Sequence, residues 1–182
     1  MSVSMDWYTR MALQGRVYRV RAGTITTHLV GDVEITDTAA EMCVDVPANY
    51  AILPIYLNIH IETLGGTVPI ITAKSVGAAS TAGTAFIPLP LKIGGAACNS
   101  TARVAAAGGV TVPAELATTT RRHYSVTLAT ADMIFEWVPI CPPVLVGPAC
   151  FYIQIGATTT GPSYYGSFDF IELPIELADK NW

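Results

Sequence analysis

IYLNIHIE, residues 55–62, decides the fold class of this chain, because its side chains alternate strictly in character. Every odd position is aliphatic, and every even position is polar or amphipathic. Successive side chains of a β-strand point to opposite faces of its sheet, so a period of two predicts a strand with one buried face. The same alternation recurs at 124–128, 151–155 and 171–177. These segments therefore predict half-buried antiparallel strands.

The closing segment, around Pro174, carries two further signals. Its apolar residues use even numbers at Phe168 and Phe170 but odd numbers from Ile171 onward. Such a change of phase predicts a β-bulge between them. Proline has no backbone N–H to donate, so Pro174 predicts that this strand lies at an edge or leaves one side unpaired.

The N-terminal segment, residues 1–15, has a helical pattern instead. Trp7, Tyr8 and Met11 fall on one face, Ser4 is a suitable N-cap, and Gly15 can end the helix. We therefore expect a short helix over about 5–14.

Together these elements predict an all-β protein. Further strands are expected at 16–21, 24–30, 33–36, 41–46, 67–73, 84–91, 103–112 and 132–138. Strands do not alternate with helices in this pattern, and 182 residues fit one domain, 1–182. The sequence thus predicts a sandwich or barrel of about 8–10 antiparallel strands with one short N-terminal helix.

Residues 75–120 differ from the rest because small side chains dominate and charges are few. An extended apolar run, FIPLPL at 86–91, lies in the middle of this segment and argues against disorder. We expect close-packed surface loops around one or two strands. Small side chains let backbones approach closely, which suits contacts between subunits.

Charged residues are scarce. They make up 13 % of the chain, against about 25 % in an average soluble domain. Either this is a thermostable or secreted β domain with a threonine-rich surface, or it is a subunit whose sides are buried against copies of itself. We favour the second interpretation.

The net charge of −4 is unevenly distributed. Residues 1–23 carry four arginines against one aspartate, a net charge of +3, and the remainder carries six basic and thirteen acidic residues, a net charge of −7. One interpretation is that the basic end binds anionic lipid or nucleic acid. The other is that the asymmetry arises by chance. Long arginine or lysine runs are absent, so we expect no specific nucleic-acid binding.

Residues 1–10 lack a basic start followed by an apolar run, and the apolar stretches 50–61 and 138–155 are interrupted by proline and polar residues. We therefore expect neither a signal peptide nor a transmembrane segment.

The four cysteines are Cys43, Cys98, Cys141 and Cys150, and they form no C-x-x-C motif, so a closed zinc site is not expected. Cys141 and Cys150 flank PPVLVGPA. They form a disulfide if two strands enter and leave this connection side by side. Two free buried thiols are the alternative, and we favour it.

The sequence predicts no catalytic, cofactor-binding or metal-binding residues, and therefore no enzyme. His28, His60 and His123 fall on polar strand faces, far apart in the chain. Ser125 shares a face with His123, but side chains at i and i+2 are about 6.5 Å apart along a strand, too far for direct proton transfer. Arg121 and Arg122 are either a phosphate or carboxylate clamp or, as we favour, the charged start of a strand.

Several aromatic and apolar residues are candidates for contacts with other subunits. For Tyr164 and Tyr165, stacking on a sugar or base and packing on the protein's own barrel are alternatives. The predicted contact residues are Trp7, Tyr8, Met11, Phe86, Tyr164, Tyr165 and Trp182.

In size, strand number and composition, including the closing strand at 168–177, the chain resembles viral single jelly-roll capsid proteins. Within this group it most resembles the small capsid subunits of tailless icosahedral bacteriophages with an internal membrane. The resemblance implies two facing four-stranded sheets in a jelly roll, and a structural virion protein that self-assembles into an icosahedral shell. It implies as partners copies of the chain, other capsid subunits, and an internal membrane met through the N-terminal segment. The alternative is a carbohydrate-binding or receptor-binding jelly-roll module that uses Tyr152, Tyr164 and Tyr165.

Overall fold

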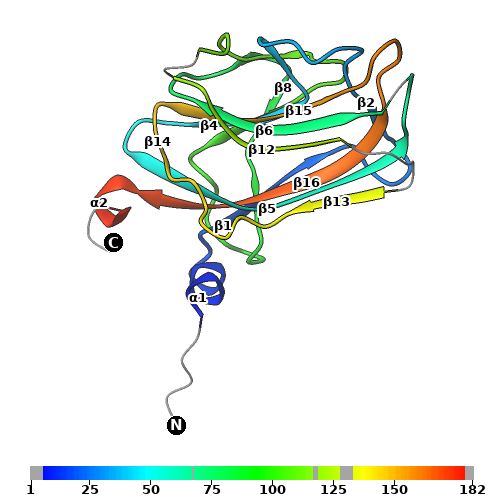
Figure 1. The fold of residues 1–182 in the computed structure, drawn as a ribbon. Coiled ribbons are helices and arrows are strands. Elements are labelled where there is room, and N and C mark those ends of the chain that lie inside the picture. The colour runs from blue at the N-terminus through cyan, green and yellow to red at the C-terminus, as the bar shows by residue number, and fades with distance from the viewer. Residues whose placement is uncertain (1–5, 67, 117–118, 128–132, 179–182) are drawn as a thin grey trace.

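A computed structural model of the protein describes residues 6–66, 68–116, 119–127 and 133–178. Two antiparallel sheets face each other in a sandwich (Figure 1). The first sheet has the order β13 (Met133–Trp137), β5 (Tyr50–Thr63), β16 (Ser163–Pro174), β1 (Val17–Ala22). The second has the order β12 (Arg121–Thr127), β6 (Ile70–Val76), β15 (Ala149–Gly156), β4 (Met42–Val46).

This strand order is that of a jelly roll. Among the eight principal strands, each sheet pairs strands that are distant in the chain, as two Greek keys require. The predicted all-β class and jelly-roll architecture are confirmed. Eight shorter strand segments accompany the principal ones in the described part of the chain, so the strand number exceeds the predicted 8–10.

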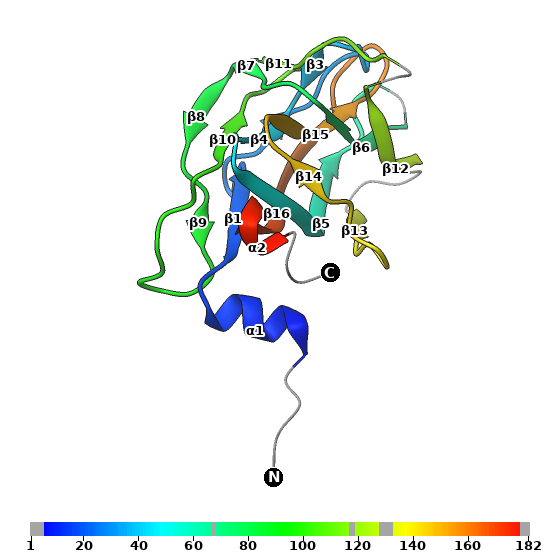
Figure 2. The same ribbon diagram turned by 90° about the vertical axis from the view of Figure 1, so that its left-hand side faces the viewer.

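Residues 77–120, which we call the crossover insertion, join β6 to β12 and extend both sheets. Its segments β10 (Thr101–Val104) and β8 (Thr84–Phe86) lengthen the second sheet next to β4, whereas β9 (Leu89–Pro90) pairs with β1 in the first sheet. Between β8 and β9 the chain passes from one sheet to the other, so the insertion covers this side of the sandwich (Figure 2). The predicted strand at 84–91 is thus two strands in different sheets.

The remaining strand segments are short. A small third sheet has the order β3 (Ala39–Ala40), β11 (Val110–Thr111), β7 (Thr81–Ala82), while β2 (Leu29–Val30) pairs with β16 and β14 (Leu145–Val146) pairs with β5. The predicted strands at 24–30 and 33–36 are largely wrong. Thr24 and Thr27 exchange backbone hydrogen bonds in a tight turn after Gly23, whose φ of +65° favours glycine.

Stacked aromatic rings fill the space between the two main sheets. The ring centroids of Phe151 and Phe168 are 4.9 Å apart, and those of Phe168 and Phe170 are 5.5 Å apart. Burial of such rings dominates the hydrophobic stabilisation of a core.

Both faces of β16 are buried, which explains the change of phase seen in the sequence. Phe168 and Phe170 face the core between the sheets, whereas Ile171 packs in a second apolar cluster beneath the N-terminal helix. The pairing register of β16 with β5 does shift between Asp169 and Phe170, but the residue passed over is Ile55 of β5. The predicted bulge is therefore present in the ladder, on the partner strand.

Two short helices flank the sandwich. α1 (Trp7–Leu13) is shorter than predicted, and its N-cap is Asp6, which accepts a hydrogen bond from the Thr9 amide at 2.9 Å. The predicted cap, Ser4, lies outside the described residues. α2 (Ile175–Ala178) replaces the predicted end of the closing strand, because the ladder of β16 ends at Pro174.

Ionic side chains on the jelly-roll strands hold the crossover insertion. The Glu172 carboxylate, on β16, accepts hydrogen bonds from the backbone amides of Asn99 (2.9 Å) and Ser100 (2.7 Å) and from the Ser100 hydroxyl (2.6 Å). It also accepts from the Asn99 side chain and the Cys98 thiol. A single buried carboxylate thus satisfies five donors of one loop, and burial of the Cys98 thiol raises its pKa.

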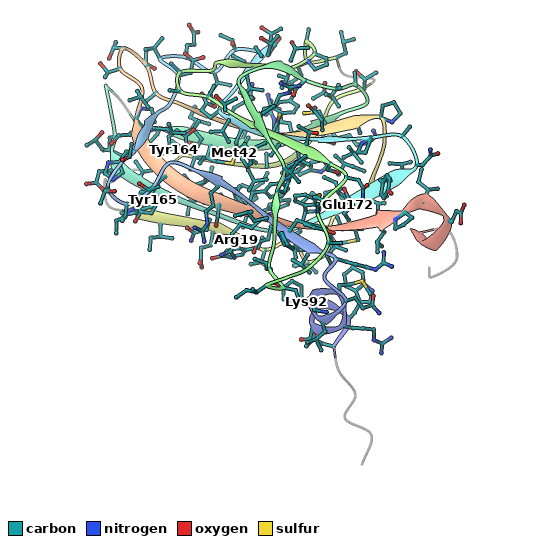
Figure 3. The ribbon with its side chains drawn as sticks, turned by 180° about the vertical axis from the view of Figure 1, so that it is seen from behind. Arg19, Met42, Lys92, Tyr164, Tyr165 and Glu172 are labelled. Carbon is teal, nitrogen blue, oxygen red and sulfur yellow. The ribbon has the colours of Figure 1, made fainter. Side chains whose placement is uncertain are left out.

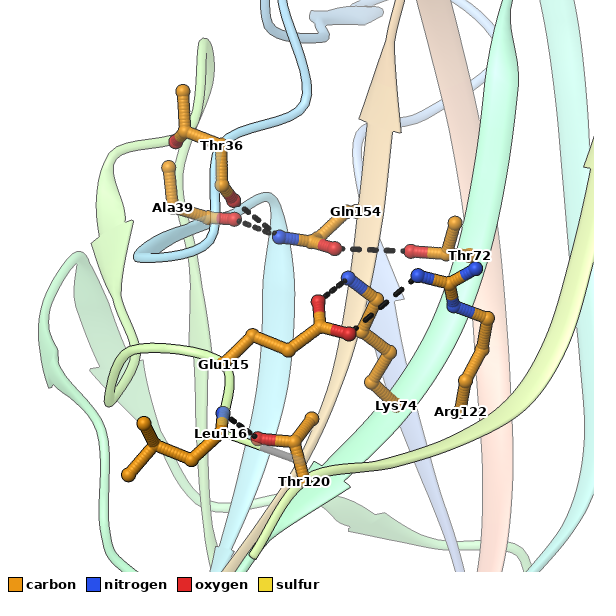
Figure 4. A network of polar contacts seen from close by, with 9 residues as sticks. All are labelled: Thr36, Ala39, Thr72, Lys74, Glu115, Leu116, Thr120, Arg122 and Gln154. Atoms are coloured by element: carbon orange, nitrogen blue, oxygen red, sulfur yellow. Dashed lines mark hydrogen bonds and ion pairs between the residues drawn. The ribbon is translucent and has the colours of Figure 1, made fainter. Parts of the chain in front are cut away.

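A second ionic contact lies on the other sheet. Lys74 of β6 is buried and forms an ion pair with Glu115 of the insertion, and Arg122 reaches the same carboxylate at 3.5 Å (Figure 4). The ion pair with Lys74 lowers the pKa of Glu115. Gln154 continues this network by bonding Thr72 and two backbone carbonyls.

Glu41 is a third anchor, and it makes stability depend on pH. It accepts hydrogen bonds from the amides of Asp32, Gly108 and Ile155, yet burial raises its pKa from 4.5 to about 8. Between these two values the folded chain holds a proton that the unfolded chain lacks. We therefore expect the free energy of unfolding to fall as pH rises through this window, by up to about 1.4 kcal/mol per pH unit.

The measurement is urea unfolding at intervals from pH 5 to 8. Glu41→Gln, which cannot ionise, should flatten the slope over this range. An equally steep decline in Glu41→Gln would assign the pH dependence to other groups.

Candidate assembly surface

Apolar side chains gather at the end of the sandwich where α1 lies. On α1, Trp7 is 40 % exposed, Tyr8 43 % and Leu13 57 %. Val138 and Ile140, in the connection that follows β13, are 65 % and fully exposed. We call these five residues the α1 surface. Isolated exposed apolar residues are ordinary, but four of these are grouped: Trp7, Tyr8 and Val138 line one groove, and Tyr8 and Leu13 line a second hollow. Such a group marks an interaction site.

Residues one turn after Trp7 and Tyr8, on the same face of α1, fix the helix on the sandwich. Met11 and Ala12 pack on the apolar cluster built by Val17, Leu53 and Ile171. The Lys92 ammonium group donates a hydrogen bond to the Leu13 carbonyl at 2.9 Å, and Figure 3 shows this side chain beside the helix. The exposed aromatic rings therefore lie on a helix that is anchored to the body of the protein.

A groove of about 470 Å³ separates α1 from the first sheet. Trp7 and Tyr8 line it together with Val138. An ion pair between Arg19 and Asp169, directly opposite each other on β1 and β16, also lines it. Both oxygens of Asp169 accept from the guanidinium at 2.7 Å, and the carboxylate is only 2 % exposed. The pair is bidentate, which gives it a fixed geometry.

The predicted contact residues of the N-terminal helix lie together. Trp7 and Tyr8 are exposed in the α1 surface. Met11, on the same helix, is half-buried where α1 packs on the sandwich. Phe86 is half-buried too, and it packs against the main core from the crossover insertion. Trp182 lies outside the described residues.

The two adjacent tyrosines have different environments. Tyr164 is fully buried in the main core, so its prediction as a contact residue is wrong (Figure 3). The Tyr164 side chain lies in the core between the two sheets. Burial there raises the pKa of its hydroxyl. Tyr165, on the opposite face, is half-buried. Tyr152 is fully buried as well, so neither it nor Tyr164 can stack on a sugar.

Two histidines that the sequence leaves isolated meet at Tyr165. The His28 ring stacks on the tyrosine with centroids 5.6 Å apart, and the His60 ring meets it edge-on at 4.7 Å. Nε2 of His28 lies 3.7 Å from a Glu62 oxygen. Sequence spacing gave no sign of this group, because β5 and β16 pair over a separation of more than 100 residues.

His123 was predicted to point outward and is instead half-buried. The register of β12 against β6 shifts between Arg122 and Tyr124, so His123 occupies a bulge. Its Nε2 lies 2.8 Å from the Ser75 hydroxyl, and burial lowers the pKa of the imidazole. Arg122 bonds Glu115 as an ionic contact within the chain, in line with the favoured interpretation of a charged strand start.

Cys141 and Cys150 do not form the disulfide that the sequence left open, and the favoured alternative of free thiols is confirmed, although only one of the two is buried. Both thiols are free, and Cys141 is exposed whereas Cys150 is buried. The strands on either side of the PPVLVGPA connection, β13 and β15, belong to different sheets, so the two cysteines do not meet. Cys150 lies instead near Cys43 and Asp45, with one potential ligand atom of each within 4.8 Å of the others. The spacing of these residues along the chain gives no sign of this cluster.

Neither helix in the described part of the chain has the length and apolar character that crossing a bilayer requires.

No protein-family description matches the sequence, and no curated protein does. Two solved structures show weak similarity: a T=1 particle derived from infectious bursal virus, and the VP2 subviral particle of infectious bursal disease virus. Each is 14 % identical over 91 % of this chain, with TM-scores of 0.23 and 0.18. The chain spans less than half the length of either subunit, 42 % and 43 %. Scores this low do not establish a shared fold, and no conclusion rests on them.

Proposed function

We propose that this protein is a structural virion protein, a capsid subunit that assembles into an icosahedral shell through contacts poor in charge. The observation that carries the proposal is the α1 surface, an exposed apolar group on a rigidly anchored helix. Apolar contacts of this kind associate without desolvating ionic groups.

The distribution of the few charges supports the proposal. Glu41, Lys74, Asp169 and Glu172 are buried. The first two and Glu172 bind the insertion, and Asp169 pairs with Arg19 of β1. A chain with only 13 % charged residues therefore exposes still fewer of them. A surface so poor in charge suits a subunit whose flanks are covered by neighbours.

We propose a second copy of the chain, or another capsid subunit, as the occupant of the α1 surface. The resemblance to subunits of membrane-containing bacteriophages suggests a membrane as the other candidate. Flotation with anionic phospholipid vesicles distinguishes the two: a protein that floats with the vesicles but stays monomeric without them uses this surface for lipid.

Light scattering and negative-stain microscopy of the purified chain test the proposal. We expect rings, capsomers or closed particles to form as concentration rises. A monodisperse monomer at every concentration, alone or with a co-expressed capsid partner, contradicts it. Binding of that monomer to a glycan array would favour the carbohydrate-binding alternative. Of the three tyrosines that this alternative uses, Tyr152 and Tyr164 are buried in the protein.

A further inference from the structure

A cluster of soft and hard metal ligands lies on the outer face of the second sheet, beneath the crossover insertion. Cys43 and Asp45 are two residues apart on β4, so their side chains share a face, and Cys150 is the direct partner of Asp45 on β15. The two sulfur atoms and a carboxylate oxygen all lie within 4.8 Å of one another. Cys43 and Cys150 also belong to a small apolar cluster on this face of the sheet, separate from the main core and from the α1 surface.

We infer that Cys43, Cys150 and Asp45 form a binding site for one thiophilic divalent cation of the zinc class. Ser80, in the crossover insertion, supplies a fourth ligand atom. Its hydroxyl lies 3.0 Å from the Cys43 sulfur and 2.8 Å from a carboxylate oxygen of Asp45. Two thiolates and one carboxylate belong to the usual ligand set of zinc, and the hydroxyl oxygen would take the fourth position, which water takes in zinc sites with three protein ligands.

The strand register favours a metal site over a disulfide. Cys43 is paired with Tyr152 and Cys150 with Asp45, so the cysteines are diagonal neighbours on adjacent strands. Cα atoms in diagonal positions are about 7–8 Å apart, beyond the usual disulfide range of about 4.4–6.8 Å. Two sulfur atoms that each bind one ion about 2.3 Å away need no such close approach.

Burial and charge also fit a bound cation. Cys43, Cys150 and Ser80 are each less than 5 % exposed, so the site is shielded from water. On binding, the two thiols release their protons to solvent, and two thiolates, one carboxylate and a divalent ion carry a net charge of −1. The Arg103 guanidinium, 3.2 Å from an Asp45 oxygen, balances that charge from the second layer.

The site would tie the insertion to the sheet. Ser80 and Arg103 both belong to the insertion, whereas the cysteines belong to β4 and β15. A bound ion therefore adds a link between these segments, and binding to the folded chain alone raises its stability. This inference does not depend on the proposed capsid function.

Cobalt(II) titration under anaerobic conditions tests the site, because cobalt(II) replaces zinc and reports its ligands by absorption. With the unmodified chain we expect saturation at one equivalent, a thiolate-to-cobalt charge-transfer band, and the intense visible bands of tetrahedral cobalt(II). Zinc should displace the cobalt and erase the bands. Saturation without a charge-transfer band, or no saturation at one equivalent, overturns the inference.

Variants locate the ligands. Cys43→Ala and Cys150→Ala should each lose the charge-transfer band and the zinc-induced rise in melting temperature, with circular dichroism confirming the fold. Cys141→Ser, which removes an exposed thiol elsewhere, should keep both. Retention of the band in either alanine variant also overturns the inference. If these variants fail to fold, the spectrum of the Cys141→Ser chain still decides the result.

Discussion

Glu172→Ala lowers the free energy of unfolding by about 3–5 kcal/mol, one of the two largest effects that we expect from this structure. The carboxylate is 4 % exposed and accepts five hydrogen bonds from residues 98–100. Alanine leaves the buried amide and hydroxyl of Ser100 without an acceptor, and each such loss costs about 1–3 kcal/mol. The loop at 98–100 then loses its attachment to the closing strand.

Urea unfolding monitored by tryptophan fluorescence measures this effect. Glu176→Ala is the matched control, because Glu176 is the same residue type four positions along the chain and is exposed. The control should change stability by less than about 0.5 kcal/mol. Similar losses in the two variants would mean that the contacts of Glu172 do not hold the insertion.

Trp7→Ser combined with Tyr8→Ser abolishes assembly while the monomer stays folded. Aromatic anchors at the centre of an interface contribute about 2 kcal/mol or more each to binding. Every 1.4 kcal/mol shifts an association constant about tenfold, so the concentration needed for assembly rises about a thousandfold or more for the pair. Every subunit of a shell makes this contact, so the double substitution weakens all of the contacts that hold the shell together.

Size-exclusion chromatography with light scattering measures the shift. Ile25→Ser is the matched control, since Ile25 is 73 % exposed but lies beyond the far end of β1. It should assemble like the unmodified chain. If the double variant assembles normally, or if Ile25→Ser disrupts assembly equally, the α1 surface is not the contact.

The alternation in the sequence predicted the strands well where one face is buried. IYLNIHIE is part of β5, with its aliphatic face in the core or beneath α1. Where both faces are buried, as on β16, apolar residues occupy odd and even positions alike. Alternation then no longer shows which face is buried, and the pattern predicted a change of phase along the strand. The chain is apolar on both sides there because α1 covers the outer face. Local pattern does not reveal such cover.

The surface and the clusters were harder to predict because they depend on pairing between distant strands. Trp7 and Tyr8 were found from their position on a short helix. Tyr164 was misplaced, because an aromatic pair after a Gly-Pro turn does not show which ring faces the core. The cluster of Cys43, Asp45 and Cys150 arises only from the register of β4 against β15, which sequence spacing does not encode.

Hydrogen–deuterium exchange, compared between assembled protein and the unassembled double variant, tests the central claim most directly. We expect amides of 8–13 and 140–141 to exchange more slowly in the assembled protein, while those of the loop at 24–28 exchange at the same rate in both. Slower exchange confined to other surfaces, with α1 and the connection after β13 unchanged, would contradict assembly through the α1 surface.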